Sequence, residues 1–292
     1  MRVMRRYRTG AKSFARPRIA VQGGRTSEYR CYVPTPVRAQ PATIPAPPFP
    51  GGLTWLNVAP LRMDKQKGRP VLVEFWDFCR VNSLRTLPYL KAWHERYADA
   101  GLRVIGVHTG AFPPSRDEAQ IEAAVARLGI EYPVVIDMEL EIWDFYGNEG
   151  WPGRYLWDTK GALFSMHYGE GAYRETELEI QELLGVERDT VAPVRPEDEP
   201  GLLLPAQTED QPGAYSGPYE AGGAWAVLSG RGELTVNGRA IAIAEPGCHP
   251  LVEHRHHTAA VLELEVGAGL ECHMTCFTPG APAPGAPAPP AA

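Results

Sequence analysis

The chain has 292 residues, 44% of them apolar, and a formal net charge of −6. This length accommodates two modest domains, and the apolar fraction excludes a chain that is disordered throughout. No apolar run reaches the roughly 18 to 20 residues that a membrane-spanning helix needs. The basic N-terminus is not followed by the apolar segment of a signal peptide. We therefore predict no membrane segment and a cytoplasmic location.

Charge is unevenly distributed along the chain. Residues 1–40 hold ten basic residues and one acid, a net of +9, whereas the remainder holds 19 basic and 34 acidic residues, a net of −15. We therefore expect no nucleic-acid binding by the folded body. The five cysteines are irregularly spaced in a chain without an export signal, so we expect free thiols. They are Cys31, Cys79, Cys248, Cys272 and Cys276.

Proline-rich stretches divide the chain. The stretch from Pro41 to Pro50 is proline-rich, and residues 280–292 are only Ala, Pro and Gly, compositions that are typical of extended, unpacked ends. The stretch at 186–212, with five prolines and seven acids, is interpreted as a domain linker. The expected organisation is a basic, proline-rich tail, an α/β domain, an acidic linker, a β-sandwich domain and a Pro/Ala tail, over 1–50, 51–185, 186–212, 213–278 and 279–292.

The segment 51–185 alternates strand and helix patterns, which indicates an α/β domain. Residues 71–76 form an apolar run that suits a buried central strand. Apolar residues near helical spacing predict a helix over 82–100, kinked at Pro88. Ser115 and Glu118 match a capping box for the next helix. The remaining expected elements are strands at 102–107, 132–136, 154–157 and 163–168 and helices at 139–147 and 174–184.

From 213 to 278 the pattern changes to short strands with Gly and Asn turns, including an Asn237-Gly238 hairpin turn. We predict a small all-β domain of jelly-roll type. His254 to His257 read as the polar loop of a hairpin, and Glu263 lies too late for a cupin-like metal site. We therefore expect no metal site and no cofactor.

Four separated motifs of the α/β segment carry a family resemblance. They are Phe75-Trp76, the run from Asn82 to Tyr89, the run from Trp151 to Leu156, and the run from Gly169 to Tyr173. In this order they resemble the thioredoxin-like domain of DipZ-type and TlpA-type thiol–disulfide oxidoreductases. The β-segment is similar to the β-sandwich appended to DipZ-type proteins. The resemblance implies an α/β thioredoxin-like fold, with a central mixed sheet flanked by helices.

The Cys-x-x-Cys pair of that family is absent. Counting back from Leu84 and forward from Trp76 both place the two family cysteines at Arg80 and Ser83. The cysteine present, Cys79, lies one residue too early. A dithiol enzyme needs a second thiol to resolve its mixed disulfide. We therefore expect no ordinary disulfide-reductase cycle.

Two hypotheses about function remain open. In the first, Cys79 acts alone as a monothiol oxidoreductase, because a helix N-terminus and the neighbouring Arg80 would favour its thiolate. In the second, the protein is non-catalytic and binds a peptide or protein; Cys79 is then a small apolar residue in a tight turn. The expected partner is a protein or peptide with a thiol or disulfide.

The resemblance also implies roles for other residues. Glu74 matches the buried carboxylate that assists proton transfer in thioredoxins, or is a relic that needs a partner for its charge. Pro152 matches the cis-proline that helps bind extended peptide, and the expected binding residues are Trp76, Trp151 and Pro152. Arg80, with the amides of the helix start, could bind a carboxylate or phosphate, or could be a solvent-exposed arginine.

Overall fold

The computed structural model describes residues 36–38 and 44–285, which belong to one compact unit. The predictions for residues 1–35 and 286–292, and for Cys31, lie outside the described residues. None of the helices in the described ranges is long and apolar enough to cross a membrane.

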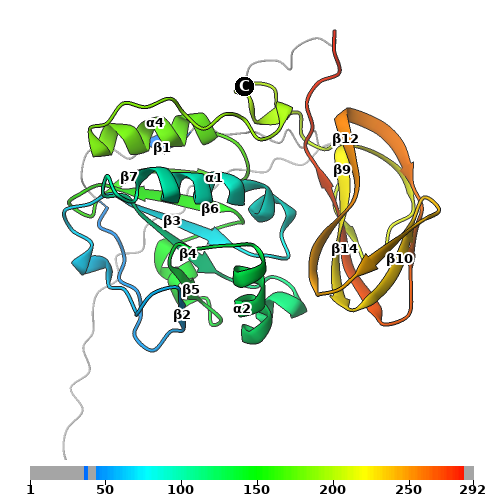
Figure 1. Cartoon of the computed structure of the whole chain (residues 1–292), viewed down its shortest axis with the longest axis horizontal. Coiled ribbons are helices and arrows are strands. Elements are labelled where there is room, and N and C mark those ends of the chain that lie inside the picture. Colours follow the sequence, from blue (N-terminus) through cyan, green and yellow to red (C-terminus); the bar gives the residue numbers. More distant parts are fainter. Residues whose placement is uncertain (1–35, 39–43, 286–292) are drawn as a thin grey trace, which may run out of the picture. The chain divides into compact units, whose positions relative to one another are not determined.

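Seven strands and four helices make up the first part of the described chain (Figure 1). The strands are β1 (Val37–Arg38), β2 (Trp55–Leu56), β3 (Val71–Trp76), β4 (Arg103–His108), β5 (Val134–Ile136), β6 (Gly153–Trp157) and β7 (Leu163–Tyr168). The helices are α1 (Val81–Tyr97), α2 (Glu118–Arg127), α3 (Glu141–Tyr146) and α4 (Tyr173–Leu184), with short 3-10 helices η1 (Met63–Lys65), η2 (Pro113–Arg116) and η3 (Pro196–Asp198).

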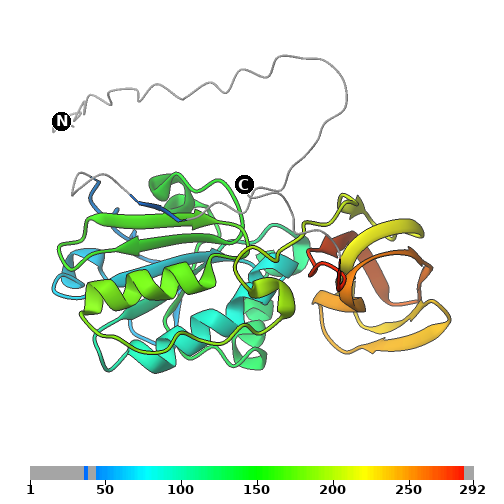
Figure 2. The ribbon, with the colours of Figure 1, turned by 90° about the horizontal axis from the view of Figure 1, so that it is seen from above.

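The strands form one mixed sheet in the order β1-β7-β6-β3-β4-β5-β2. Strands β3, β4 and β5 are parallel, while β6 and β7 are antiparallel to their neighbours. Helices α1, α2 and α4 pack on one face of the sheet, and α3 packs on the other. Figure 2 shows α1 and α4 side by side. This is a thioredoxin-like fold, as the sequence motifs predict.

Strand β3 occupies the predicted residues and is buried along its whole length. Since successive side chains of a strand face opposite sides, Leu72 and Trp76 enter the core under α1, whereas Val73 and Phe75 enter the core under α3. Apolar residues on both faces are what a strand covered on both faces requires, and the single charged residue of β3 is Glu74. Helix α1 continues through Pro88 as one element.

The predicted capping box at Ser115 and Glu118 is wrong. The N-cap of α2 is Asp117, whose carboxylate accepts a hydrogen bond from the backbone N–H of Gln120 at 3.1 Å. Ser115 lies in η2 and is fully buried, and its hydroxyl donates to Asp77 at 3.0 Å. A tertiary contact therefore takes the hydroxyl that the local pattern assigns to capping.

The C-terminal region contains only strands. They are β8 (Gln211–Pro212), β9 (Gly217–Gly230), β10 (Gly232–Val236), β11 (Arg239–Ile243), β12 (Gly247–Leu262), β13 (Leu264–Val266) and β14 (Leu270–Thr278). They form two antiparallel sheets, β11-β10-β13 and β12-β9-β14-β8. The Asn237-Gly238 turn joins β10 to β11 with positive φ at both residues, as predicted.

His254 to His257 do not form the predicted hairpin loop. They lie within the long strand β12, at a register shift between Glu253 and Thr258. Glu253 pairs with Gly223 and Thr258 with Ala221. The four intervening residues therefore bulge out of a strand that continues on both sides.

The segment 186–212 begins with hydrogen bonds to α1 and α4. The backbone N–H of Val191 donates to Glu177 of α4 at 2.7 Å, and that of Val194 donates to the hydroxyl of Tyr89 of α1 at 2.8 Å. These contacts attach the predicted linker to two helices of the thioredoxin-like fold.

Candidate functional site

Three segments meet beyond the carboxyl ends of β3 and β4. They are the start of α1 at Arg80, the loop from Thr109 to Phe112, and the Trp151-Pro152 dipeptide before β6. Carboxyl ends of neighbouring parallel strands meet at one edge of a sheet, where ligands of α/β proteins commonly bind. The structure thus brings together Arg80, Trp151 and Pro152 of the predicted site residues.

Arg80, to which the motif register assigns the first family cysteine position, is the N-cap residue of α1. Its guanidinium lies 5.0 Å from the ring centroid of Phe112 and 4.9 Å from that of Trp151. Such cation–π contacts hold a guanidinium in one orientation. The side chain is partly exposed, while its buried Nε has no hydrogen-bond partner among residues 36–38 and 44–285.

Ser83, to which the motif register assigns the second family cysteine position, makes a buried hydrogen bond. It is buried in the first turn of α1, and its hydroxyl oxygen accepts a hydrogen bond from the backbone N–H of Asp77 at 3.2 Å. A serine hydroxyl cannot resolve a mixed disulfide.

Cys79 has no exposed surface. Burial raises the pKa of its thiol above the ordinary value, and the nearby Asp77 carboxyl raises this pKa further. The predicted lowering of the thiol pKa is therefore wrong. The physical reason is that the side chain lies in an apolar cluster with Val227 and Cys248 of the C-terminal strands, away from water.

Asp77, directly after β3, is a buried carboxyl that the sequence analysis did not select. It accepts hydrogen bonds from the backbone N–H groups of Cys79 (2.7 Å) and Ala111 (2.8 Å) and from the Ser115 hydroxyl (3.0 Å). Burial outweighs these bonds and raises the pKa of Asp77 to about 6. His108 Nε2 lies 3.8 Å from Asp77 Oδ1, and burial lowers the pKa of His108 to about 3.

The sequence contains a signal that Asp77 and His108 lie close together. Asp77 follows the central strand, and His108 ends the next parallel strand, which pairs with it directly. Polar residues at the ends of adjacent parallel strands are expected to lie close together. His108 is neutral near pH 7, because protonating it would place an additional charge in the core.

We expect Asp77 to make stability depend on pH. Its folded pKa of about 6 exceeds the ordinary 3.8, so the folded state binds this proton more tightly and stability falls as pH rises from about 4 to about 6. Urea unfolding at several pH values should show wild-type losing about 2 kcal/mol relative to Asp77→Asn between pH 4 and pH 6. A difference in free energy of unfolding between wild-type and Asp77→Asn that does not change with pH would contradict the raised pKa of Asp77.

Glu74 and Trp76 are placed in the core. Glu74 is fully buried and pairs with Arg154 Nε at 3.1 Å; its pKa is raised by burial, while Arg154 opposes the rise. The carboxylate therefore has the charge partner that the relic interpretation requires.

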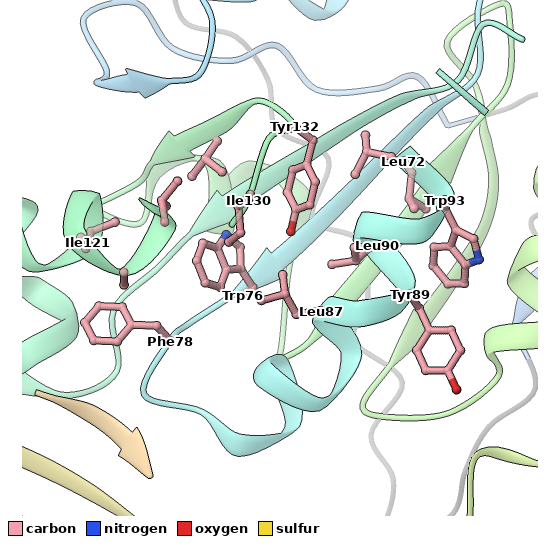
Figure 3. Packing of buried hydrophobic residues seen from close by; sticks show 14 of the residues in the cluster. Leu72, Trp76, Phe78, Leu87, Tyr89, Leu90, Trp93, Ile121, Ile130 and Tyr132 are labelled. Atoms are coloured by element: carbon pink, nitrogen blue, oxygen red, sulfur yellow. The ribbon is translucent and has the colours of Figure 1, made fainter. Parts of the chain in front are cut away.

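Trp76 is 1% exposed and packs beneath Leu87 of α1 and beside Ile130 (Figure 3). This burial leaves Trp76 no surface with which to contact a bound peptide.

The Trp151–Pro152 peptide bond is cis, as the resemblance implies. The indole N–H of Trp151 donates to the hydroxyl of Thr109 at 2.7 Å, and its ring centroid lies 4.4 Å from that of Trp143. Both rings are partly exposed. We call Arg80, Phe112, Trp143 and Trp151 together the Trp151 surface.

The strand order and the cis-proline loop are those of a thioredoxin-like domain. Protein DipZ of Mycobacterium bovis is 33% identical over 163 residues, which is 55% of this chain and 22% of DipZ. The chain therefore spans about a fifth of the length of this relative. The thiol-disulfide oxidoreductase YkuV of Bacillus subtilis is 25% identical over 140 residues, 48% of this chain and 94% of YkuV.

Solved structures include similar domains. A thiol-disulfide isomerase from Corynebacterium glutamicum has a TM-score of 0.44 and 22% sequence identity, and it covers 49% of this chain and 98% of its own. No protein-family model matches the sequence. Within the described ranges, no group of three or more His, Cys, Asp or Glu side chains is arranged to hold a metal ion.

Proposed function

We propose that this protein is a non-catalytic, thioredoxin-fold binding protein that takes an extended peptide segment on the Trp151 surface. One observation carries the proposal: Cys79 is fully buried, and the motif register assigns the two family cysteine positions to Arg80 and Ser83. The thiolate is the nucleophile in thiol chemistry, and burial disfavours it. The site therefore supports binding better than disulfide exchange.

The chemistry of the Trp151 surface suits a peptide. Partly exposed rings of Trp143 and Trp151 provide apolar area for side chains, and such rings are common at recognition sites because they combine apolar area with a polar group. The Arg80 guanidinium is held between two rings and can donate paired hydrogen bonds to a carboxylate. We therefore expect the bound segment to carry an Asp, a Glu or a terminal carboxylate.

An array of 12-residue peptides, with and without acidic residues, would test this function on the full chain. We expect captured peptides to be rich in Asp or Glu, and Trp151→Ala and Arg80→Ala each to weaken binding at least about tenfold, or 1.4 kcal/mol. The matched control is Arg69→Ala, since Arg69 is exposed and lies two residues before the opposite end of β3. Unchanged binding by Trp151→Ala would refute the proposed surface.

The monothiol alternative is tested separately, by peroxide oxidation of Cys79 at neutral pH, followed by peptide mass spectrometry. The binding function predicts that Cys79 is oxidised far more slowly than the partly exposed Cys272 under the same conditions. Oxidation of Cys79 at the rate of Cys272 would favour a monothiol enzyme instead.

A further inference from the structure

Strand β9 is buried on both faces. Ala224, Ala226 and Leu228 belong to the core of the C-terminal strands, whereas Trp225 and Val227, which alternate with them, pack against the core beside α1. One face of the sheet β12-β9-β14-β8 is therefore turned toward the thioredoxin-like domain. We call this the capping face, formed by Trp225, Val227, Cys248, Met274 and Cys276.

The capping face covers the residues that precede α1. Val227, Cys248 and Cys276 lie in one buried cluster with Phe78 and Cys79. The three thiols are close enough for Cys79 and Cys276 to contribute to the raised pKa of Cys248, although burial is the main cause. The burial of Cys79 thus depends on strands that follow it by about 150 to 200 residues in the sequence.

The edge of the contact between the capping face and the thioredoxin-like domain is polar. Arg127 at the end of α2 pairs with Glu245, before β12, at 3.3 Å, and both side chains are about one-third exposed. Gly247 lies so near that a Cβ atom there would be 3.5 Å from Phe78. Exposed ion pairs contribute little to stability, so the apolar contact of the capping face carries most of the attachment.

The C-terminal strands also have a core of their own, which includes Leu228, Leu234, Leu251, Leu262 and Phe277. Separating the capping face from the thioredoxin-like domain leaves this second core intact. A part of a protein that has its own hydrophobic core can separate from the rest at a lower free energy than global unfolding requires.

We infer that the C-terminal strands form a cap that opens as one unit and exposes Cys79, Cys248 and Cys276 together. The closed cap keeps three thiols away from water at the position where thioredoxin-like enzymes react. Opening restores solvent to them and so favours their reactive thiolates. This device is separate from peptide binding, since Trp143 and Trp151 are partly exposed while the cap is closed.

The test uses the full chain with Cys31→Ser and Cys272→Ser, so that three thiols remain to be labelled by an aromatic disulfide reagent. Each thiolate attacks the reagent's disulfide, forms a mixed disulfide and releases one aromatic thiolate. We expect slow labelling in native buffer, with one common rate for the three sites, resolved by peptide mass spectrometry. That rate should exceed the rate of global unfolding measured in parallel with urea.

A matched pair of variants locates the opening. Val227 and Val107 are both fully buried, but Val227 is on the capping face and Val107 is in the core under α3. Val227→Ala should raise all three labelling rates at least tenfold, and Val107→Ala should lower the urea midpoint without raising them. Unequal rates at the three cysteines, or equal acceleration by both variants, would overturn the proposal.

Discussion

Replacing Arg154 with methionine should lower the free energy of unfolding by about 3 to 5 kcal/mol. Arg154 Nε lies 3.1 Å from Glu74 Oε2 with both side chains buried, and its Nη1 donates to Thr176 at 3.0 Å. The guanidinium also lies over the ring of Trp93. The variant leaves the Glu74 carboxylate in the core without a cation. Urea unfolding followed by tryptophan fluorescence at pH 7 measures the loss.

The pH dependence of this loss distinguishes charge from packing. Burial raises the pKa of Glu74 even with Arg154 present, and removing the cation raises this pKa further. When the pKa of a carboxyl is higher in the folded than in the unfolded state, protonation of that carboxyl stabilises the fold. Arg154→Met should therefore lose less free energy of unfolding near pH 5 than near pH 8. Glu74→Gln/Arg154→Met, which buries no charge, should recover part of the loss. Equal losses at both pH values would indicate that the ring contacts, not the charge, dominate.

Replacing Arg85 with methionine should lower the free energy of unfolding by a similar amount, about 3 to 5 kcal/mol, because two carboxylates lose the guanidinium that they contact. Arg85, 7% exposed on α1, contacts Glu170 at 2.7 Å and Glu197 at 2.8 Å. Glu197 lies in η3, inside the segment predicted to be a linker. Urea unfolding measures the global loss, and subtilisin cleavage followed by mass spectrometry measures the local one.

We expect Arg85→Met to accelerate subtilisin cleavage within 186–212 at least tenfold, since the ion pair to Glu197 holds this segment against α1. A second anchor, the hydrogen bond from the Tyr89 hydroxyl to Asp198 at 2.7 Å, remains in the variant. The control Arg174→Met changes an exposed arginine of α4 and should alter stability by less than about 0.5 kcal/mol. Cleavage unchanged in Arg85→Met would show that the ion pairs do not hold the segment.

Local patterns predicted the elements of the thioredoxin-like fold well. The β3 residues match the predicted strand, and α1, α3 and α4 lie within a few residues of their predicted ranges. Each of these elements is defined by its own apolar period or by its flanking Gly and Pro residues, which are visible in a short window. The Asn237-Gly238 turn belongs to the same class of local signal.

Predictions failed where a distant segment supplied the decisive contact. Ser115 has the local pattern of a capping residue, but Asp77 binds its hydroxyl. Cys79 has the local setting of a reactive thiol, but Val227 and its neighbours remove it from water. Nor does the composition of the predicted linker 186–212 indicate that Glu197 is the partner of a buried arginine. A single sequence contains no direct record of such long-range pairs.

The sequence by itself determined that the run 75–89 contains Cys79 as its single cysteine and no Cys-x-x-Cys pair, and the motif register assigns the two family cysteine positions to Arg80 and Ser83. The tertiary structure decided the environment of the remaining thiol and the orientation of Arg80. Burial and ring stacking depend on which segments pack together, and here they depend on strands β9, β12 and β14 and on the loop at Phe112. The pKa of Cys79 follows from that packing, because burial removes the solvent that would stabilise a thiolate and the nearby Asp77 carboxyl disfavours it further.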